Sequence, residues 1–182
     1  MTNATNNTPS IYVACLSSYN SGILHGVWID LDQYCGVLPR CGEDVMHEVR
    51  GMLEESPVPD AEEWAVHDHQ GFGGVHIGEN PDFDNLCEIA QLVEAHGGAI
   101  LSMIDNDSSL AEDPQELLRA FEASYVGQFE SWEDYAYHCV EEQCILDGAS
   151  DLLAMYFDYK AYGYTLSIEN WMDDDGNVFA PY

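Results

Sequence analysis

The sequence predicts an α+β fold in an elongated chain of three small domains: a ββαβ-type N-terminal unit, a helical middle and a mixed α/β C-terminal unit. Three observations predict it. Strand-like and helix-like patterns alternate at both ends of the chain, whereas the middle carries only helical patterns. The 182 residues are 46% hydrophobic, which is enough apolar material for a core. A formal net charge of −30 penalises compactness and favours small domains along an axis over one globule.

The predicted boundaries follow the breaks between these patterns. Residues 1–9 are uncharged and lack the basic and apolar regions of a signal peptide, so we expect a disordered tail. An N-terminal α/β domain is predicted over 10–74, a central helical domain over 75–121 and a C-terminal α/β domain over 122–182. No apolar run approaches the ~20 residues of a membrane span, so a soluble, cytoplasmic protein is expected.

The N-terminal domain is predicted to open with a β-hairpin. Ile11–Tyr19 and Ile23–Leu31 are rich in β-branched and aromatic residues, and the Asn-Ser-Gly sequence between them is typical of a turn. Apolar residues then recur at helical spacing over Cys41–Glu55. The alternating segment Trp64–Phe72 predicts a third strand and completes the ββαβ unit.

The middle of the chain carries two helix signals. Asp113, Pro114 and Glu116 form an N-cap, a first-position proline and a third-position acid, which together mark the start of a helix. An earlier helix has one apolar face, formed by Phe83, Leu86, Cys87, Ala90 and Val93.

The C-terminal domain is predicted to mix strands and helices. A strand is expected around Tyr125, a capping box at Ser131–Asp134 starts a helix, and another helix follows near Leu152. The Asp-Gly step before Asn177 suits a hairpin turn, with strands at Tyr164–Glu169 and Asn177–Ala180.

Cysteine usage favours reduced thiols. The chain has six cysteines, none of them in a CxxC pair, and no secretion signal precedes them. We therefore expect small buried side chains and no disulfides. The six are Cys15, Cys35, Cys41, Cys87, Cys139 and Cys144.

Charge is the strongest feature of the composition. Between Met52 and Leu118 the chain has sixteen Asp or Glu and no Lys or Arg, and the whole chain has 34 acidic against four basic residues. Such a surface should repel nucleic acid and anionic membranes and attract cationic surfaces. Duplex DNA carries one charge per ~1.7 Å, so thirty charges match about 50 Å of duplex. Composition alone fits both a salt-adapted acidic protein and a specific acidic inhibitor.

Motifs for catalysis are weak. His67, Asp68 and His69 are the best candidates for a metal-assisted hydrolase site in a salt-adapted domain, which is the alternative function, but two imidazoles fall short of the three protein ligands of catalytic zinc. Asp173–Gly176 resembles a calcium loop, yet Trp171 stands where an acidic ligand is needed. No GxSxG or phosphate-binding loop is present. No catalytic residue, metal or cofactor is predicted, and the protein is not expected to be an enzyme.

Three stretches carry a family resemblance. IYVACLSSYNSGILHGVWIDL at 11–31, WAVHDHQGF at 64–72 and LLAMYFDYKAYGYTL at 152–166 resemble the ArdA family of antirestriction proteins. The third resembles the antirestriction motif of that family, and it departs from the motif where Tyr164 follows Gly163 in place of a charged pair.

The resemblance implies a DNA mimic, carried by mobile elements, that evades host defence. Such a protein occupies the DNA-binding groove of a type I restriction-modification enzyme, at its methyltransferase core, as an elongated, curved homodimer joined through the C-terminal domain. It would block restriction and modification of incoming DNA without binding nucleic acid or membrane.

Two groups of site residues follow from the charge and the motif. The motif residues have near-helical spacing and are expected to pack in a core or a dimer contact; they are Tyr156, Phe157, Asp158, Tyr159, Ala161, Tyr162 and Leu166. The predicted DNA-mimicking acidic surface comprises Glu54, Glu55, Asp60, Glu62, Glu63, Glu79, Asp82, Asp84, Glu88, Glu94, Asp105, Asp107, Glu112, Asp113, Glu116 and Glu122.

Overall fold

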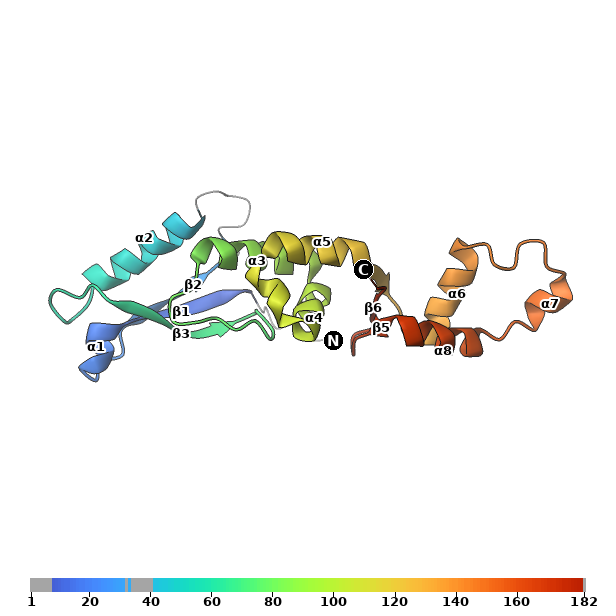
Figure 1. Ribbon diagram of the computed structural model, residues 1–182. Coiled ribbons are helices and arrows are strands. Elements are labelled where there is room, and N and C mark those ends of the chain that lie inside the picture. The colour runs from blue at the N-terminus through green and yellow to red at the C-terminus, as the bar shows by residue number, and fades with distance from the viewer. Residues whose placement is uncertain (1–7, 32, 34–40, 182) are drawn as a thin grey trace. The chain divides into compact units, whose positions relative to one another are not determined.

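The computed structural model describes residues 8–31, 33 and 41–181 (Figure 1). Its described part is mixed α+β, with eight α-helices and two small three-stranded antiparallel sheets, as predicted for the fold class. The chain forms two compact units, Met1–Leu118 and Arg119–Tyr182, and their boundary falls within helix α5 (Pro114–Ser124). The division into three domains stays a prediction. None of the helices in the described ranges is long and apolar enough to cross a bilayer.

The first unit is built on a sheet of order β2-β1-β3, formed by β1 (Ser10–Cys15), β2 (Gly26–Asp30) and β3 (Trp64–Gln70). The predicted pairing of the first two strands is confirmed, with Ile11 opposite Ile29. Helix α2 (Cys41–Glu54) lies over one face of this sheet (Figure 1), and its Val45 and Val49 are fully buried. The alternation of strand residues therefore puts one face in the core.

The predicted hairpin turn was wrong in detail. Helix α1 (Leu16–Asn20) replaces the second half of the first strand, so the connection to β2 runs from Leu16 to His25. Cys15 caps this helix, since its Sγ accepts a hydrogen bond from the Ser18 amide at 3.5 Å. The buried Ser18 hydroxyl also pairs with Ser56 at 2.9 Å. These polar contacts stabilise a helical turn that the β-branched pattern does not predict.

Helices fill the rest of the first unit. The predicted helix appears as α3 (Phe83–His96), and the predicted Asp113 cap of α5 is confirmed, with Oδ1 accepting from the amides of Gln115 at 3.0 Å and Glu116 at 3.1 Å. Helix α4 (Gly98–Asn106) and the 3₁₀ helix η2 (Ser108–Glu112) were not predicted. Gly97, at φ +60°, separates α3 from α4.

The second unit has a sheet of order β4-β6-β5, formed by β4 (Tyr125–Gln128), β5 (Trp171–Met172) and β6 (Asn177–Phe179). Three helices accompany it: α6 (Trp132–Glu142), α7 (Asp151–Met155) and α8 (Tyr159–Glu169). The capping box of α6 is confirmed, because the Asp134 amide donates to Ser131 Oγ at 3.2 Å. The expected strand near Tyr125 and helix near Leu152 are also present.

The predicted strand at Tyr164–Glu169 was wrong, because these residues belong to α8. Tyr162 and Leu166, four apart, pack against the buried cluster of Tyr135, Cys139 and Val178, and this helical packing overrides the strand-like composition. The Asp-Gly turn itself is confirmed, but the strand that enters it is β5.

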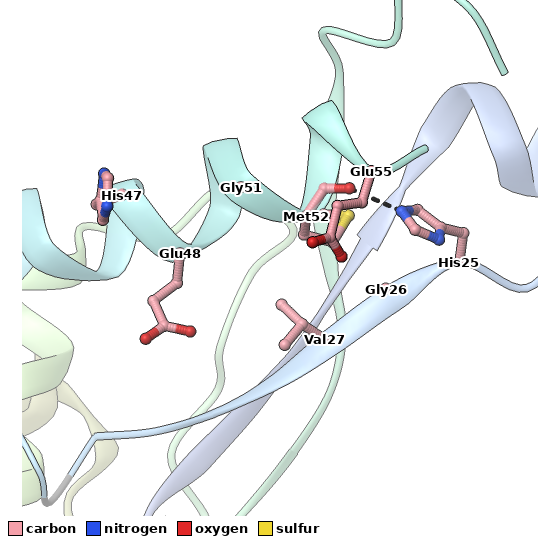
Figure 2. Close-up of a pocket in the computed structure, with 8 residues that line it drawn as sticks. All are labelled: His25, Gly26, Val27, His47, Glu48, Gly51, Met52 and Glu55. Carbon is pink, nitrogen blue, oxygen red and sulfur yellow. Dashed lines mark hydrogen bonds between the residues drawn. The ribbon is translucent and has the colours of Figure 1, made fainter. Parts of the chain in front are cut away.

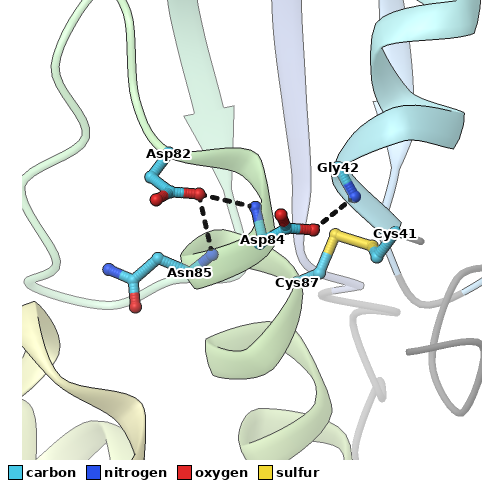
Figure 3. The surroundings of a disulfide bond; sticks show 6 residues. All are labelled: Cys41, Gly42, Asp82, Asp84, Asn85 and Cys87. Carbon is cyan, nitrogen blue, oxygen red and sulfur yellow. Dashed lines mark hydrogen bonds between the residues drawn. A yellow bond between two sulfur atoms is a disulfide. The ribbon is translucent and has the colours of Figure 1, made fainter. Parts of the chain in front are cut away.

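The expectation of no disulfides was also wrong. Cys41 at the start of α2 is bonded to Cys87 in α3, with a Cα–Cα distance of 6.3 Å that lies in the usual range for a disulfide (Figure 3). The two residues are 46 apart in sequence, and only the packing of the helices brings them together. Of the other cysteines, Cys15 and Cys139 are buried thiols and Cys144 is exposed. Cys35 lies outside the described residues.

Candidate functional site

The predicted acidic surface is accessible. Of its sixteen carboxylates, fifteen are exposed and only Glu88 is half-buried. They come from the end of α2, the connection to β3, and the helices α3 to α5 with their linking loops. Because these carboxylates are exposed, a partner can reach them directly.

Six of these carboxylates accept hydrogen bonds from the chain and so support its local structure. Three are caps: Asp82 accepts from the Asp84 amide at the start of α3 at 2.9 Å, Asp107 caps η2, and Asp113 caps α5. The hydrogen bond from the Ser109 hydroxyl, with that from its amide, lowers the pKa of Asp107. These carboxylates were counted as partner contacts in the sequence prediction, and the structure gives them a folding role as well.

The other three connect different elements. Asp84 Oδ1 accepts from the Gly42 amide at 2.8 Å, at the N-terminus of α2 and beside the disulfide (Figure 3). Asp105 Oδ1 accepts from the Gly74 amide at 2.8 Å, and Glu88 accepts from the Gln115 side chain at 2.9 Å. A side chain at position 42 would place its Cβ 2.7 Å from the Asp84 oxygen, so only glycine allows this approach.

The remaining ten carboxylates are exposed and accept no hydrogen bond from any other described residue. We call them the free carboxylates. Their hydrogen-bonding capacity is open to water or to a cationic partner. They are Glu54, Glu55, Asp60, Glu62, Glu63, Glu79, Glu94, Glu112, Glu116 and Glu122.

The acidic surface extends beyond the predicted set. Besides Glu122, residues 119–182 carry twelve Asp or Glu against Arg119 and Lys160, and the sequence prediction did not use them because it relied mainly on the basic-free stretch. On α2, Glu43 and Asp44 are exposed in the first turn as well. Both units therefore present carboxylates to solvent.

Several motif residues make contacts within the second unit. Asp158 caps α8 by accepting from the Ala161 amide at 2.9 Å, and the Tyr159 ring stacks on Tyr137 with centroids 3.6 Å apart. Phe157 contacts the Tyr159 and Tyr162 rings edge-on, at 4.8 and 5.8 Å. These are packing contacts within the second unit, and the role of the motif stays a prediction.

Burial affects two tyrosines of this core. Desolvation, with smaller contributions from Cys139 and Tyr162, raises the pKa of Tyr135 to about 12. Desolvation also raises the pKa of Tyr162. Both phenols are therefore neutral at physiological pH and act as packing groups.

Large apolar side chains are exposed on α7 and at the outer side of α8. Helix α7 buries none of its residues. Six such side chains have exposed fractions of 63 to 75%. We call this set the α7–α8 apolar residues: Leu152, Leu153, Met155, Tyr156, Tyr164 and Ile168.

The structure gives no support to a metal site at 67–69. His67 contacts the Tyr19 ring at 4.8 Å and His69 the Phe72 ring at 6.3 Å, while Asp68 accepts from the His69 amide. In the part of the chain that is described, no three His, Cys, Asp or Glu side chains converge as metal ligands do.

A separate cavity of about 420 Å³ lies between β2 and α2 (Figure 2). His25 closes one end, where its Nε2 makes a 2.7 Å hydrogen bond to the Met52 carbonyl at the end of α2. His47, Glu48 and Glu55 line it from the helix. It holds no catalytic constellation such as a nucleophile beside a base.

Comparison with known families matches residues 11–177 to the antirestriction protein (ArdA) family. Comparison with curated proteins finds no match. The matched range includes most of both sheets, all ten free carboxylates and the whole motif. The chain therefore belongs to the ArdA family of antirestriction proteins.

Proposed function

We propose that this antirestriction protein is a DNA mimic that occupies the DNA-binding groove of a type I restriction-modification enzyme. One observation carries the proposal: the free carboxylates are exposed and accept no hydrogen bond from the described residues, and nine of the ten lie in a stretch without Lys or Arg. A groove that binds DNA presents Lys and Arg to phosphates. Carboxylates that no internal partner neutralises are suited to take the place of those phosphates.

The binding energy should be spread over many contacts. An exposed ion pair contributes only ~0 to 1 kcal/mol, so ten such contacts together give several kcal/mol while any one of them is dispensable. Release of counterions makes such binding weaken as salt rises. Contacts to phosphates carry no base information, so a mimic of this kind inhibits enzymes of different recognition sequence and blocks both restriction and modification.

We further propose that the protein acts as an elongated homodimer joined through the α7–α8 apolar residues. A second copy is the occupant that suits them, because most soluble oligomers are homo-oligomers and two-fold dimers are the commonest of these. Two copies also double the charge to that of about 100 Å of duplex. The proposed target places the action in the cytoplasm, and the protection of incoming DNA suits a gene carried by a mobile element.

Displacement of labelled duplex from a type I methyltransferase tests the proposal. Fluorescence anisotropy should fall as the protein is added, and the apparent affinity should weaken between 50 and 200 mM salt, conditions over which phosphate-type contacts lose about 10³-fold or more. A variant with the ten free carboxylates changed to amides is the matched control and should displace much less DNA. Undiminished DNA binding at micromolar wild-type protein would refute the proposal.

A further inference from the structure

An aromatic pair lies on the open face of the N-terminal sheet. Tyr12 on β1 stands opposite Trp28 on β2, with ring centroids 5.5 Å apart and planes tilted by 46°. Their neighbour Val27 lines the cavity under α2, so successive alternation directs Trp28 to the other face. Trp28 is 45% exposed, whereas the pair Trp64–Phe83 of the same unit stacks inside it.

The backbone holds this pair in place. Tyr12 leans over β2 at Gly26, where a Cβ would lie only 2.6 Å from the Tyr12 hydroxyl. The glycine therefore lets the phenol ring lie across the strand and beside Trp28. The two rings are ordered before any partner arrives, which reduces the entropy lost on binding.

Two carboxylates flank the rings on the same face. Asp68 on β3 is opposite Tyr12 on β1, and Asp30 follows Trp28 by two residues on β2. Both are exposed. Directly opposite residues have Cβ atoms roughly 5 Å apart, so Asp68 stands next to the Tyr12 ring. The first basic residue of the sequence is Arg40, so the strands β1 and β2 supply no cation of their own.

Aromatic faces beside carboxylates are suited to bind a guanidinium group. The ring quadrupole attracts a cation, and arginine stacks on a ring while its N–H groups reach a carboxylate. An apolar partner would desolvate Asp30 and Asp68 without neutralising them, which is costly. A second copy of this chain would bring the same negative charge to the same place. The chemistry of the face therefore selects a cationic occupant.

We propose that Tyr12, Trp28, Asp30 and Asp68 form an arginine-binding surface, at which the sheet docks an arginine of the restriction-modification enzyme. This proposal rests on the proposed function and adds an aromatic anchor to it, separate from the free carboxylates. It accounts for a tryptophan kept exposed on a surface that otherwise presents acids.

The displacement assay with the methyltransferase tests the surface by paired variants. Trp28→Leu keeps the apolar area and removes the indole, and should weaken the apparent affinity about three- to thirty-fold. Trp28→Phe should weaken the apparent affinity less than Trp28→Leu does. Asp68→Asn should weaken the apparent affinity a few-fold at low salt and little at high salt. Leu24→Ser, which alters an 87% exposed side chain outside the strands, is the matched control and should stay within about twofold of wild type.

The outcomes separate the two proposals. If the wild-type protein displaces DNA and Trp28→Leu, folded by circular dichroism, does so equally well, the arginine-binding surface is refuted and the mimic is not. A direct titration needs no enzyme: arginine amide should shift the Trp28 indole NMR signal more than lysine amide does. Equal shifts with the two amides, or none, would likewise overturn the assignment.

Discussion

Breaking the disulfide between α2 and α3 should cost the first unit much of its stability. The Cys41–Cys87 bond closes a loop with a sequence separation of 46, and the loop-closure relation gives about 4 kcal/mol for such a length. For a unit of 118 residues the unfolding entropy is about 0.25 kcal/mol/K, so the melting temperature should fall by roughly 15 °C. The Asp84 bond to Gly42 stays in the reduced protein and keeps α2 near α3.

Differential scanning calorimetry of the oxidised protein, the protein in dithiothreitol and the Cys41→Ser/Cys87→Ser variant measures this. The reduced wild type and the double variant should melt together, below the oxidised protein. Cys144→Ser removes an exposed free thiol and is the matched control, with no change expected. Equal melting temperatures in all samples, with the bond shown by mass spectrometry in the oxidised one, would refute the loop-closure reasoning.

Four other predictions concern charge, pH and assembly. Asp113→Ala should lower the free energy of unfolding by about 1 kcal/mol because α5 loses its cap, whereas Glu62→Ala should leave it unchanged or raise it. Equal effects of the two substitutions in urea unfolding would contradict the division into capping and free carboxylates. Moderate salt should raise the melting temperature by screening the carboxylates, and a fall would count against unpaired surface charge. Because burial raises the pKa of Tyr135 to about 12, the stability that this neutral phenol contributes is complete below pH 10 and is lost as pH rises through 12. Thermal scans should show this loss of stability, and Tyr135→Phe should make the loss smaller. Leu153→Asp should convert a dimer to a monomer in analytical ultracentrifugation, while Leu24→Asp should not; an unchanged dimer would place the interface elsewhere.

Local patterns were sufficient to predict several elements. Helices α2, α3, α5 and α6 have apolar periodicity together with a cap or a breaker, and the pairing of β1 with β2 follows from two β-rich runs close in sequence. Acidic exposure could also be predicted, because carboxylates are seldom buried without a partner.

The predictions that were wrong concern segments whose structure is determined by tertiary contacts. Helix α1 depends on the hydroxyl of Ser56, nearly forty residues away, and the helical state of Tyr164–Glu169 depends on packing against α6. The Cys41–Cys87 bond likewise needs the α2–α3 contact. The Asp113 cap could be predicted from the Pro114 and Glu116 that follow it, whereas the role of Asp107 could not, because it depends on the Ser109 amide that folds onto the carboxylate.

The most direct measurement for DNA mimicry is the structure of this protein bound to a type I methyltransferase. We predict that the free carboxylates lie within ion-pair distance of the enzyme's Lys and Arg side chains that contact phosphates in its DNA complex. We also predict that DNA and this protein cannot be bound together. A complex in which the protein sits outside the DNA-binding groove, with the free carboxylates in solvent, would refute DNA mimicry.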